Sequence, residues 1–153
     1  MARFPGTDKH RNRAGLAPGD VVRCRRSRSN AELHLADRRG VVAEVRDQHA
    51  RVVFEPRGQG TWLANDALLP EADPQDTELA RLARLLGLLH AERLEYDADD
   101  DELQVFSGAF DAAALDEARA LWGPRLRRCA LRAEGVHQFV TCFGVEAPAP
   151  GTD

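Results

Sequence analysis

The sequence predicts an α+β protein of 153 residues with two folded parts. Over residues 16–70, apolar and polar residues alternate in short runs bounded by Pro and Gly, which is typical of strands separated by turns. Over residues 78–146, apolar spacings of three and four mark two helices, and two strand-like runs follow each of them. Residues 1–15 and 147–153 mix Pro, Gly and charge without an apolar period, so we expect both ends to be disordered.

The first part contains five short elements. After a turn at residues 18–20, the run VVRC alternates, with Val22 and Cys24 on one face and arginines on the other. The long polar segment RSRSNAELHLADRRG follows, and GVVAEV and RVVFEP then indicate a hairpin. Pro56 cannot donate to a β-ladder and the glycines of RGQG permit unusual backbone angles, so the chain must turn before TWL.

This order of elements resembles the small SH3-like barrels, including those of the KOW and Tudor types. The matching features are PGDVVR at the first strand, a long first loop, the GVVAEV and RVVFEP hairpin, and the ending TWLANDALLP. In that ending a strand, a single turn (65–68) and a closing residue would seal the barrel. The resemblance implies an SH3-like β-barrel over residues 16–70, of a kind found beside bacterial helicases and transcription factors and also in protein-docking modules.

The second part begins after the segment PEADPQDT, which has no large apolar residue and predicts a linker over residues 71–77. The helix that follows carries a stripe of leucines that is too short for a coiled coil and favours core packing: Leu79, Leu82, Leu86 and Leu89. RLEY and LQVF indicate a hairpin, Asp111 caps a second helix, and RRCALRA and VHQFVTCF indicate a last hairpin. An antiparallel sheet with both helices on one face buries these apolar residues most simply, as a small α-β-β-α-β-β domain.

The register of the last hairpin decides which residues face away from the helices. A two-residue turn at residues 134–135 pairs Cys129 with Val140. The face under the helices would then consist of Cys129, Leu131, Ala133, Val136, Val140 and Cys142. The reverse face would carry Arg128, Arg132, His137, Phe139, Thr141 and Phe143. Two Phe beside two Arg would bind a protein partner, unless the first part packs there, so the predicted partner-binding residues are Arg128, Arg132, His137, Phe139 and Phe143.

Charge is distributed unevenly along the chain. Residues 1–46 contain 11 Lys and Arg against 5 Asp and Glu, a net charge of +6, while residues 47–153 contain 10 against 20, a net charge of −10. A basic head on an acidic body indicates contact with nucleic acid or with a charged partner.

Arginines concentrate on the first strand and the long loop after it. Guanidinium groups bind phosphate bidentately, and several of them on one rim would follow a polyanion. The predicted nucleic-acid-binding residues are Arg23, Arg25, Arg26, Arg28, Arg38, Arg39 and Trp62. The alternative is a solvated strand face whose charge the acidic second part neutralises. An aromatic cage for a methylated amine is disfavoured, because burial of Phe54 would leave Trp62 as the only ring.

Neither a metal site nor a cofactor is predicted. The acidic loop DADDDE begins like an EF-hand, but Glu102 stands where Gly is required and Gly108 stands where the closing Glu is required. In the last hairpin, the register above points His137 away from Cys129 and Cys142, which argues against zinc.

No Ser, Cys or Thr nucleophile stands near a His in a recognisable motif, so we expect a protein without catalytic activity. Three widely spaced cysteines argue against a disulfide framework, and there is no apolar run of about 18 residues for a membrane span. The sequence therefore predicts a cytoplasmic accessory protein that binds DNA or RNA through an Arg-rich small barrel. The alternative is a protein-interaction subunit, an adaptor or inhibitor, that docks through the acidic second part.

Overall fold

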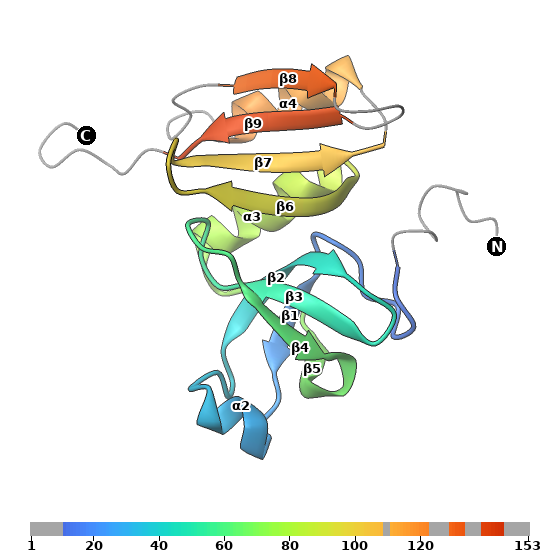
Figure 1. Ribbon diagram of the computed structural model, residues 1–153, viewed down its shortest axis with the longest axis vertical. Helices are drawn as coiled ribbons and strands as arrows, with labels where there is room; N and C mark the ends of the chain where they lie inside the picture. Colours follow the sequence, from blue (N-terminus) through green and yellow to red (C-terminus); the bar gives the residue numbers. More distant parts are fainter. Residues whose placement is uncertain (1–10, 109–110, 123–128, 134–138, 146–153) are drawn as a thin grey trace, which may run out of the picture.

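Figure 1 shows a computed structural model of the chain, which describes residues 11–108, 111–122, 129–133 and 139–145. Helices and strands are both present, and the strands form two antiparallel sheets, so the protein has the predicted α+β class. None of the helices within these ranges is long and apolar enough to cross a membrane.

The first sheet is open and has five strands in the order β4-β3-β2-β1-β5. Its strands are β1 (Val21–Cys24), β2 (Arg39–Val45), β3 (His49–Val53), β4 (Thr61–Ala64) and β5 (Leu68–Pro70). Successive strands from β1 to β4 pair with one another, and β5 returns to pair with β1. The 3-10 helix η1 (Asn65–Ala67) lies between β4 and β5, so a single turn carries the chain from one edge of the sheet to the other.

Side chains that point alternately to the two faces of the sheet form the first hydrophobic core on one of these faces. Val22, Val42 and Val52 are each 0% exposed and belong to one cluster on the inner face of the sheet. Gly40 lies opposite Val22, and a Cβ at Gly40 would lie 2.6 Å from Val52 Cγ1 and 2.7 Å from Val53 O. A glycine is therefore needed where β2 passes this close to β3.

The second part contains α3 (Thr77–Leu88), β6 (Ala91–Asp97), β7 (Glu102–Ser107), α4 (Ala112–Trp122), β8 (Cys129–Ala133) and β9 (Phe139–Gly144). Its strands form an antiparallel sheet in the order β6-β7-β9-β8. Asp76 caps α3, because its Oδ1 accepts hydrogen bonds from Glu78 N (2.8 Å) and Leu79 N (3.1 Å). Both helices cover the same face of this sheet (Figure 1), and the α3 leucines and Trp122 of α4 share one buried cluster there.

The predicted register of the last hairpin is wrong. Cys129 pairs with Phe143 and not with Val140, a shift of three positions along β9. Ala133 pairs with Phe139, which excludes a two-residue turn at residues 134–135. Because side chains alternate along a strand, an odd shift exchanges the two faces of β9 relative to β8.

Phe143 consequently lies on the helix-covered face. It is 0% exposed and belongs to the cluster that contains Trp122, so it cannot form part of an uncovered docking surface. Val140 and Cys142, which a two-residue turn would place under the helices, form a separate buried cluster with Phe106. The other predicted partner-binding residues are Phe139, which is partly buried, Arg132, which lies in β8, and Arg128 and His137, which lie outside the described residues.

One hydrophobic cluster runs through both parts of the chain. Val41, Ala43 and Val53, on the outer face of the first sheet, are buried together with the α3 leucines and with residues of the second sheet. The predicted linker, residues 71–77, lies between β5 and the first turn of α3. The two sheets that it joins therefore bury part of their surface against each other.

The N-terminal end of the described chain is fastened to the first sheet. Asn12 Oδ1 accepts hydrogen bonds from Ala14 N and Leu16 N, both at 3.0 Å, and Arg13 N donates to Asp47 O (3.1 Å). Of the predicted tails, residues 1–10 and 147–153 lie outside the described residues.

Candidate nucleic-acid interface

The β1–β2 connection, residues 25–38, presents most of the predicted arginines. Its centre is a short helix, α2 (Arg28–Glu32), where the sequence indicates only a long polar segment. Hydrogen bonds from Cys24 N to Arg38 O (2.8 Å) and from Asp37 N to Cys24 O (2.9 Å) close the base of the connection. Both ends of the connection therefore leave the sheet side by side.

Asn30 fastens α2 to the sheet. Its side chain is buried, and its Nδ2 donates to Arg25 O and to Ala67 O, both at 3.0 Å. Ser27 Oγ caps the helix by accepting a hydrogen bond from Asn30 N (3.1 Å), and Leu35 inserts into the first core. The connection is thus tied to the sheet at several points along its length.

Four arginines of this connection are exposed, and we call them the connection arginines: Arg25, Arg26, Arg28 and Arg38. The side chains of Arg26 and Arg28 are 82% and 93% exposed, and each forms one ion pair with a carboxylate of the same connection, at 2.6 and 3.4 Å. In the described part of the chain, no carboxylate lies within ion-pair distance of Arg25 or Arg38. Exposed ion pairs contribute only about 0–1 kcal/mol, so a phosphate could replace these carboxylates at little cost.

Arg23 and Arg39 are held in a different way. They lie opposite each other on β1 and β2, and their side chains are 33% and 28% exposed. Glu71 Oε2 lies 3.3 Å from Arg23 Nε and 3.6 Å from Arg39 Nε, and Asp37 Oδ1 lies 3.3 Å from Arg23 Nη1. The predicted set therefore divides into four exposed arginines and two that Glu71, directly after β5, already engages.

Trp62 does not join the connection arginines. It lies on the edge strand β4, and the guanidinium carbon of Arg46 stacks over its ring at 4.4 Å from the centroid. Arg46 follows β2 whereas Arg38 precedes it, and a strand of this length spans roughly 20 Å. Arg38 in turn lies over the partly buried ring of Phe54, at 4.5 Å.

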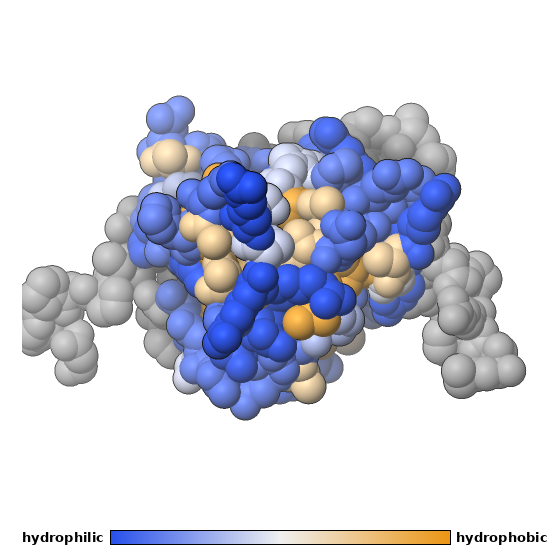
Figure 2. Space-filling view, turned by 90° about the horizontal axis from the view of Figure 1, so that it is seen from below, coloured by the Kyte–Doolittle hydropathy of each residue, from blue (hydrophilic) through white to orange (hydrophobic). Residues whose placement is uncertain are grey.

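The connection lies at the end of the molecule opposite to the second sheet (Figure 1). Figure 2 views that end, and hydrophilic residues cover most of it, with smaller hydrophobic areas between them. Residues 1–71 carry 13 Lys and Arg against 9 acids (net +4), and residues 72–153 carry 8 against 16 (net −8). The fold therefore holds the connection arginines away from the more acidic part of the chain.

Arg51 links the two parts and was not a predicted site residue. Its side chain is 7% exposed, and it donates through Nη2 to Leu94 O on β6 (2.5 Å) and through Nη1 to Gln59 O (2.7 Å). Nη2 also lies 3.2 Å from Glu44 Oε1 and 3.4 Å from Glu95 Oε1. Strand alternation predicts that Arg51 faces away from the first core, but it does not show that the second sheet covers that face.

Arg57 forms a second link. It donates to both oxygens of Asp101, at 2.8 and 3.0 Å, and to Val145 O (2.5 Å). Tyr96 Oη also donates to Asp101 (2.7 Å), and Gln59 Nε2 donates to Tyr96 O (2.5 Å). The hydrogen bonds to Asp101 raise the pKa of Arg57 and the pKa of Tyr96 above their ordinary values. Arg57 therefore ties the first part to the turn between β6 and β7.

The acidic turn does not bring together the three aspartates that stand at the first EF-hand positions, Asp97, Asp99 and Asp101. Oxygens of Asp97, Asp100 and Glu102 lie within 4.8 Å of one another, whereas Asp101 is turned to Arg57. Gln104 Nε2 donates to Glu102 (3.3 Å). Asp100 is exposed whereas Glu102 is 2% exposed, and clustered acidic groups are common without an ion, so we assign no ion to this cluster.

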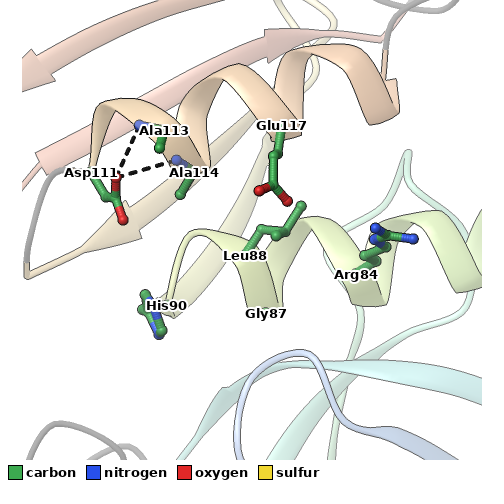
Figure 3. A pocket seen from close by; sticks show the side chains of 8 residues that line it. All are labelled: Arg84, Gly87, Leu88, His90, Asp111, Ala113, Ala114 and Glu117. Carbon is green, nitrogen blue, oxygen red and sulfur yellow. Dashed lines mark hydrogen bonds between the residues drawn. The ribbon is translucent and has the colours of Figure 1, made fainter.

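A hollow of about 480 Å³ lies between the end of α3 and the start of α4 (Figure 3). It is lined by Arg84, Gly87, Leu88, His90, Asp111, Ala113, Ala114 and Glu117. Asp111 already caps α4, since its Oδ1 accepts hydrogen bonds from Ala113 N (2.9 Å) and Ala114 N (3.3 Å). The hollow contains none of the predicted site residues, and its mixture of acidic and basic groups favours no single class of ligand.

Comparison of the chain with protein-family models, with curated proteins and with solved structures finds no match. The functional conclusion therefore rests on the side chains and their arrangement.

Proposed function

We propose that this protein is a non-catalytic accessory protein that binds the phosphate backbone of nucleic acid through the connection arginines. The observation that carries the proposal is the exposure of Arg25 and Arg38, which have no ion-pair partner in the described part of the chain. They stand beside Arg26 and Arg28, whose side chains are 82% and 93% exposed. Guanidinium groups in this state keep their donors available for phosphate oxygens.

The arrangement of the first sheet supports an SH3-like barrel as the platform. Its strand order and the return of β5 to β1 after η1 agree with such a barrel, in which the β1–β2 connection would be the long first loop. The sheet is open between its edge strands β4 and β5, so the proposal concerns the strand order of such a barrel and not its closure. Because folds of this kind have many ligands, the arginines and not the fold point to nucleic acid.

Charge separation in the molecule supports the same conclusion. A polyanion is repelled by the net charge of −8 on residues 72–153, but it can approach the opposite end, where the connection lies (Figure 1). Arg23, Arg39 and Trp62 lie outside this contact, because Glu71 engages the first two and Arg46 covers the ring of the third.

A pair of charge-matched double variants tests the proposal. Arg25→Gln with Arg38→Gln removes the two unpaired connection arginines, and Arg84→Gln with Arg119→Gln removes two exposed arginines of α3 and α4. Binding of a labelled 20-base-pair DNA is measured by fluorescence anisotropy against salt concentration. Four phosphate contacts correspond to a log–log salt slope of about −3.6, and loss of two contacts reduces its magnitude by about 1.8.

We expect the first double variant to lose affinity on the order of 100-fold at about 50 mM salt, because two counterion-release contributions disappear. The α3 and α4 variant carries the same change in net charge and should bind within about threefold of the unmodified protein. Equal losses in the two variants would show that overall charge, and not the connection, attracts the DNA. Absence of binding at low salt would refute the proposal and leave a protein partner as the alternative.

A further inference from the structure

We infer that the ligand of the connection arginines is a nucleic-acid duplex in preference to a single strand. This inference rests on the proposed function and names the substrate class for the same site. It follows from what the connection contains, what it lacks, and where it lies in the molecule.

The connection offers unpaired bases only one ring, the imidazole of the exposed His34. Proteins that bind single strands combine a basic groove with aromatic rings on which successive bases stack, at about 1–3 kcal/mol per base. No Phe, Tyr or Trp occurs among residues 25–38. Arg38 contacts the ring of Phe54, which lies outside the connection, packs against the first core and is covered by Arg38 on one face. Trp62 carries Arg46 on its face and lies beyond the opposite end of β2.

Groups that could read base edges are also few. Asn and Gln are the amides that recognise adenine, and Asn30 is the only amide residue in the connection. Its Nδ2 is already used, because it donates to Arg25 O and Ala67 O while the side chain is buried. The connection therefore offers mainly guanidinium groups, which bind phosphates and can also pair with guanine, so we expect the dependence on sequence to be small and limited to guanine.

Phosphate contacts alone favour a duplex. Duplex DNA carries one charge per about 1.7 Å of axis, and each neutralised phosphate contributes about 0.9 to the salt slope, against about 0.7 for a single strand. With four contacts, the log–log salt slope is about −3.6 for a duplex and about −2.8 for a single strand. At about 50 mM salt, this difference in slope corresponds to about tenfold in affinity. The two classes of ligand are therefore distinguishable by direct titration.

Position in the fold limits the contact to one end of the molecule. The connection projects at the opposite end from the second sheet, so a duplex can lie across it without approaching the acidic part (Figure 1). Four guanidinium groups within one short connection can neutralise only a few neighbouring phosphates. We therefore expect a small footprint and a salt slope no steeper than about −3.6.

The test compares matched ligands with the full-length protein. A mixed-sequence 20-base-pair DNA, the RNA duplex of the same sequence, each separated strand and oligo-dT of equal length are titrated by anisotropy at about 50 mM salt. We expect both duplexes to bind about tenfold more tightly than their separated strands, and a second duplex of scrambled sequence to bind within about threefold of the first. Replacing Trp62 with Leu should leave the affinity for the DNA duplex within about twofold, because Trp62 lies outside the contact.

The outcomes separate this inference from the function on which it rests. Oligo-dT or a separated strand that binds at least as tightly as the duplex would overturn the duplex preference. If that single-strand binding still fell in the Arg25→Gln, Arg38→Gln variant, phosphate binding by the connection would stand. A loss of duplex affinity in Trp62→Leu, with an unchanged melting temperature, would place Trp62 in the contact and overturn the inference. No binding by any of these ligands would remove the proposed function itself.

Discussion

Replacing Arg51 with Met should cost this protein a large part of its stability. Arg51 is almost completely buried between the two sheets, and its guanidinium donates to Gln59 O and Leu94 O while it faces Glu44 and Glu95. Methionine matches the aliphatic stem of arginine and has no hydrogen-bond donor, so the variant keeps the packing of the stem and removes all contacts of the guanidinium at once.

The structure sets the size of the effect. Hydrogen bonds from a charged donor contribute about 1.5–3 kcal/mol each, and Arg51 makes two of them to backbone carbonyls. Breaking a buried ion pair on one side costs about 3–5 kcal/mol. The carboxylates of Glu44 and Glu95 are 28% and 34% exposed, so water can solvate them again and recover part of this cost. We therefore expect a loss of at least about 3 kcal/mol, the lower bound of the two hydrogen bonds alone, against a total of about 5–15 kcal/mol for a typical domain.

Urea unfolding followed by far-UV circular dichroism measures the loss as a shift in the midpoint at constant slope. Arg51→Lys keeps the charge but cannot form the same fork of hydrogen bonds, so its loss should be intermediate. Arg28→Met is the control, because Arg28 is 93% exposed and forms one ion pair four residues along α2, worth about 0.3–0.5 kcal/mol. An Arg51→Met variant no less stable than this control would show that the buried contacts do not hold the two sheets together.

Three other substitutions probe local packing and the polar link between the two parts. Gly40→Ala should lower the free energy of unfolding by about 1–3 kcal/mol, since its Cβ would meet Val52 and the backbone at under 3 Å; Gly87→Ala, with open space around its Cβ in α3, should raise it by about 0.5–1 kcal/mol. Shifts of the urea midpoint in opposite directions would confirm this pair of predictions. An unchanged midpoint in Gly40→Ala would mean that β2 has room to move away from β3. The hydrogen bond to Asp101 raises the pKa of Tyr96 above its ordinary 10.0, so the folded state keeps a proton that the unfolded chain releases. The stabilisation from this hydrogen bond is therefore complete below about pH 10 and is lost as pH rises through the raised pKa. Tyr96→Phe should therefore flatten the fall in stability above about pH 10, and an unchanged pH profile would contradict the role of this hydrogen bond.

Several features were predictable because they depend on residues close together in the chain. Leucines at spacings of three and four after Asp76 specify α3 with its cap, and alternation in GVVAEV and RVVFEP specifies the hairpin of β2 and β3. The clustering of arginines in the β1–β2 connection is likewise visible in the sequence, and the structure leaves four of them exposed. Local spacing determines these features, because helix periodicity, helix capping and strand alternation each involve residues that lie within a few positions of one another in the chain.

Other features depend on pairing between distant segments, and tertiary structure alone decided them. The register of β8 and β9 differs by three positions from the two-residue-turn interpretation, and this odd difference places Phe143 under the helices instead of on the surface. Glu71 engages Arg23 across 48 positions of sequence, which removes that arginine from the exposed set. Strand alternation places Arg51 on the face of β3 that points away from the first core, where a solvated residue would be expected. The second sheet covers this face, and Leu94 O accepts a hydrogen bond from Arg51. The sequence by itself thus determined most of the segments that form helices and strands, α2 excepted, and where positive charge accumulates. Which faces are covered, and which arginines remain available to a ligand, depends on contacts that exist only once the two sheets have packed together.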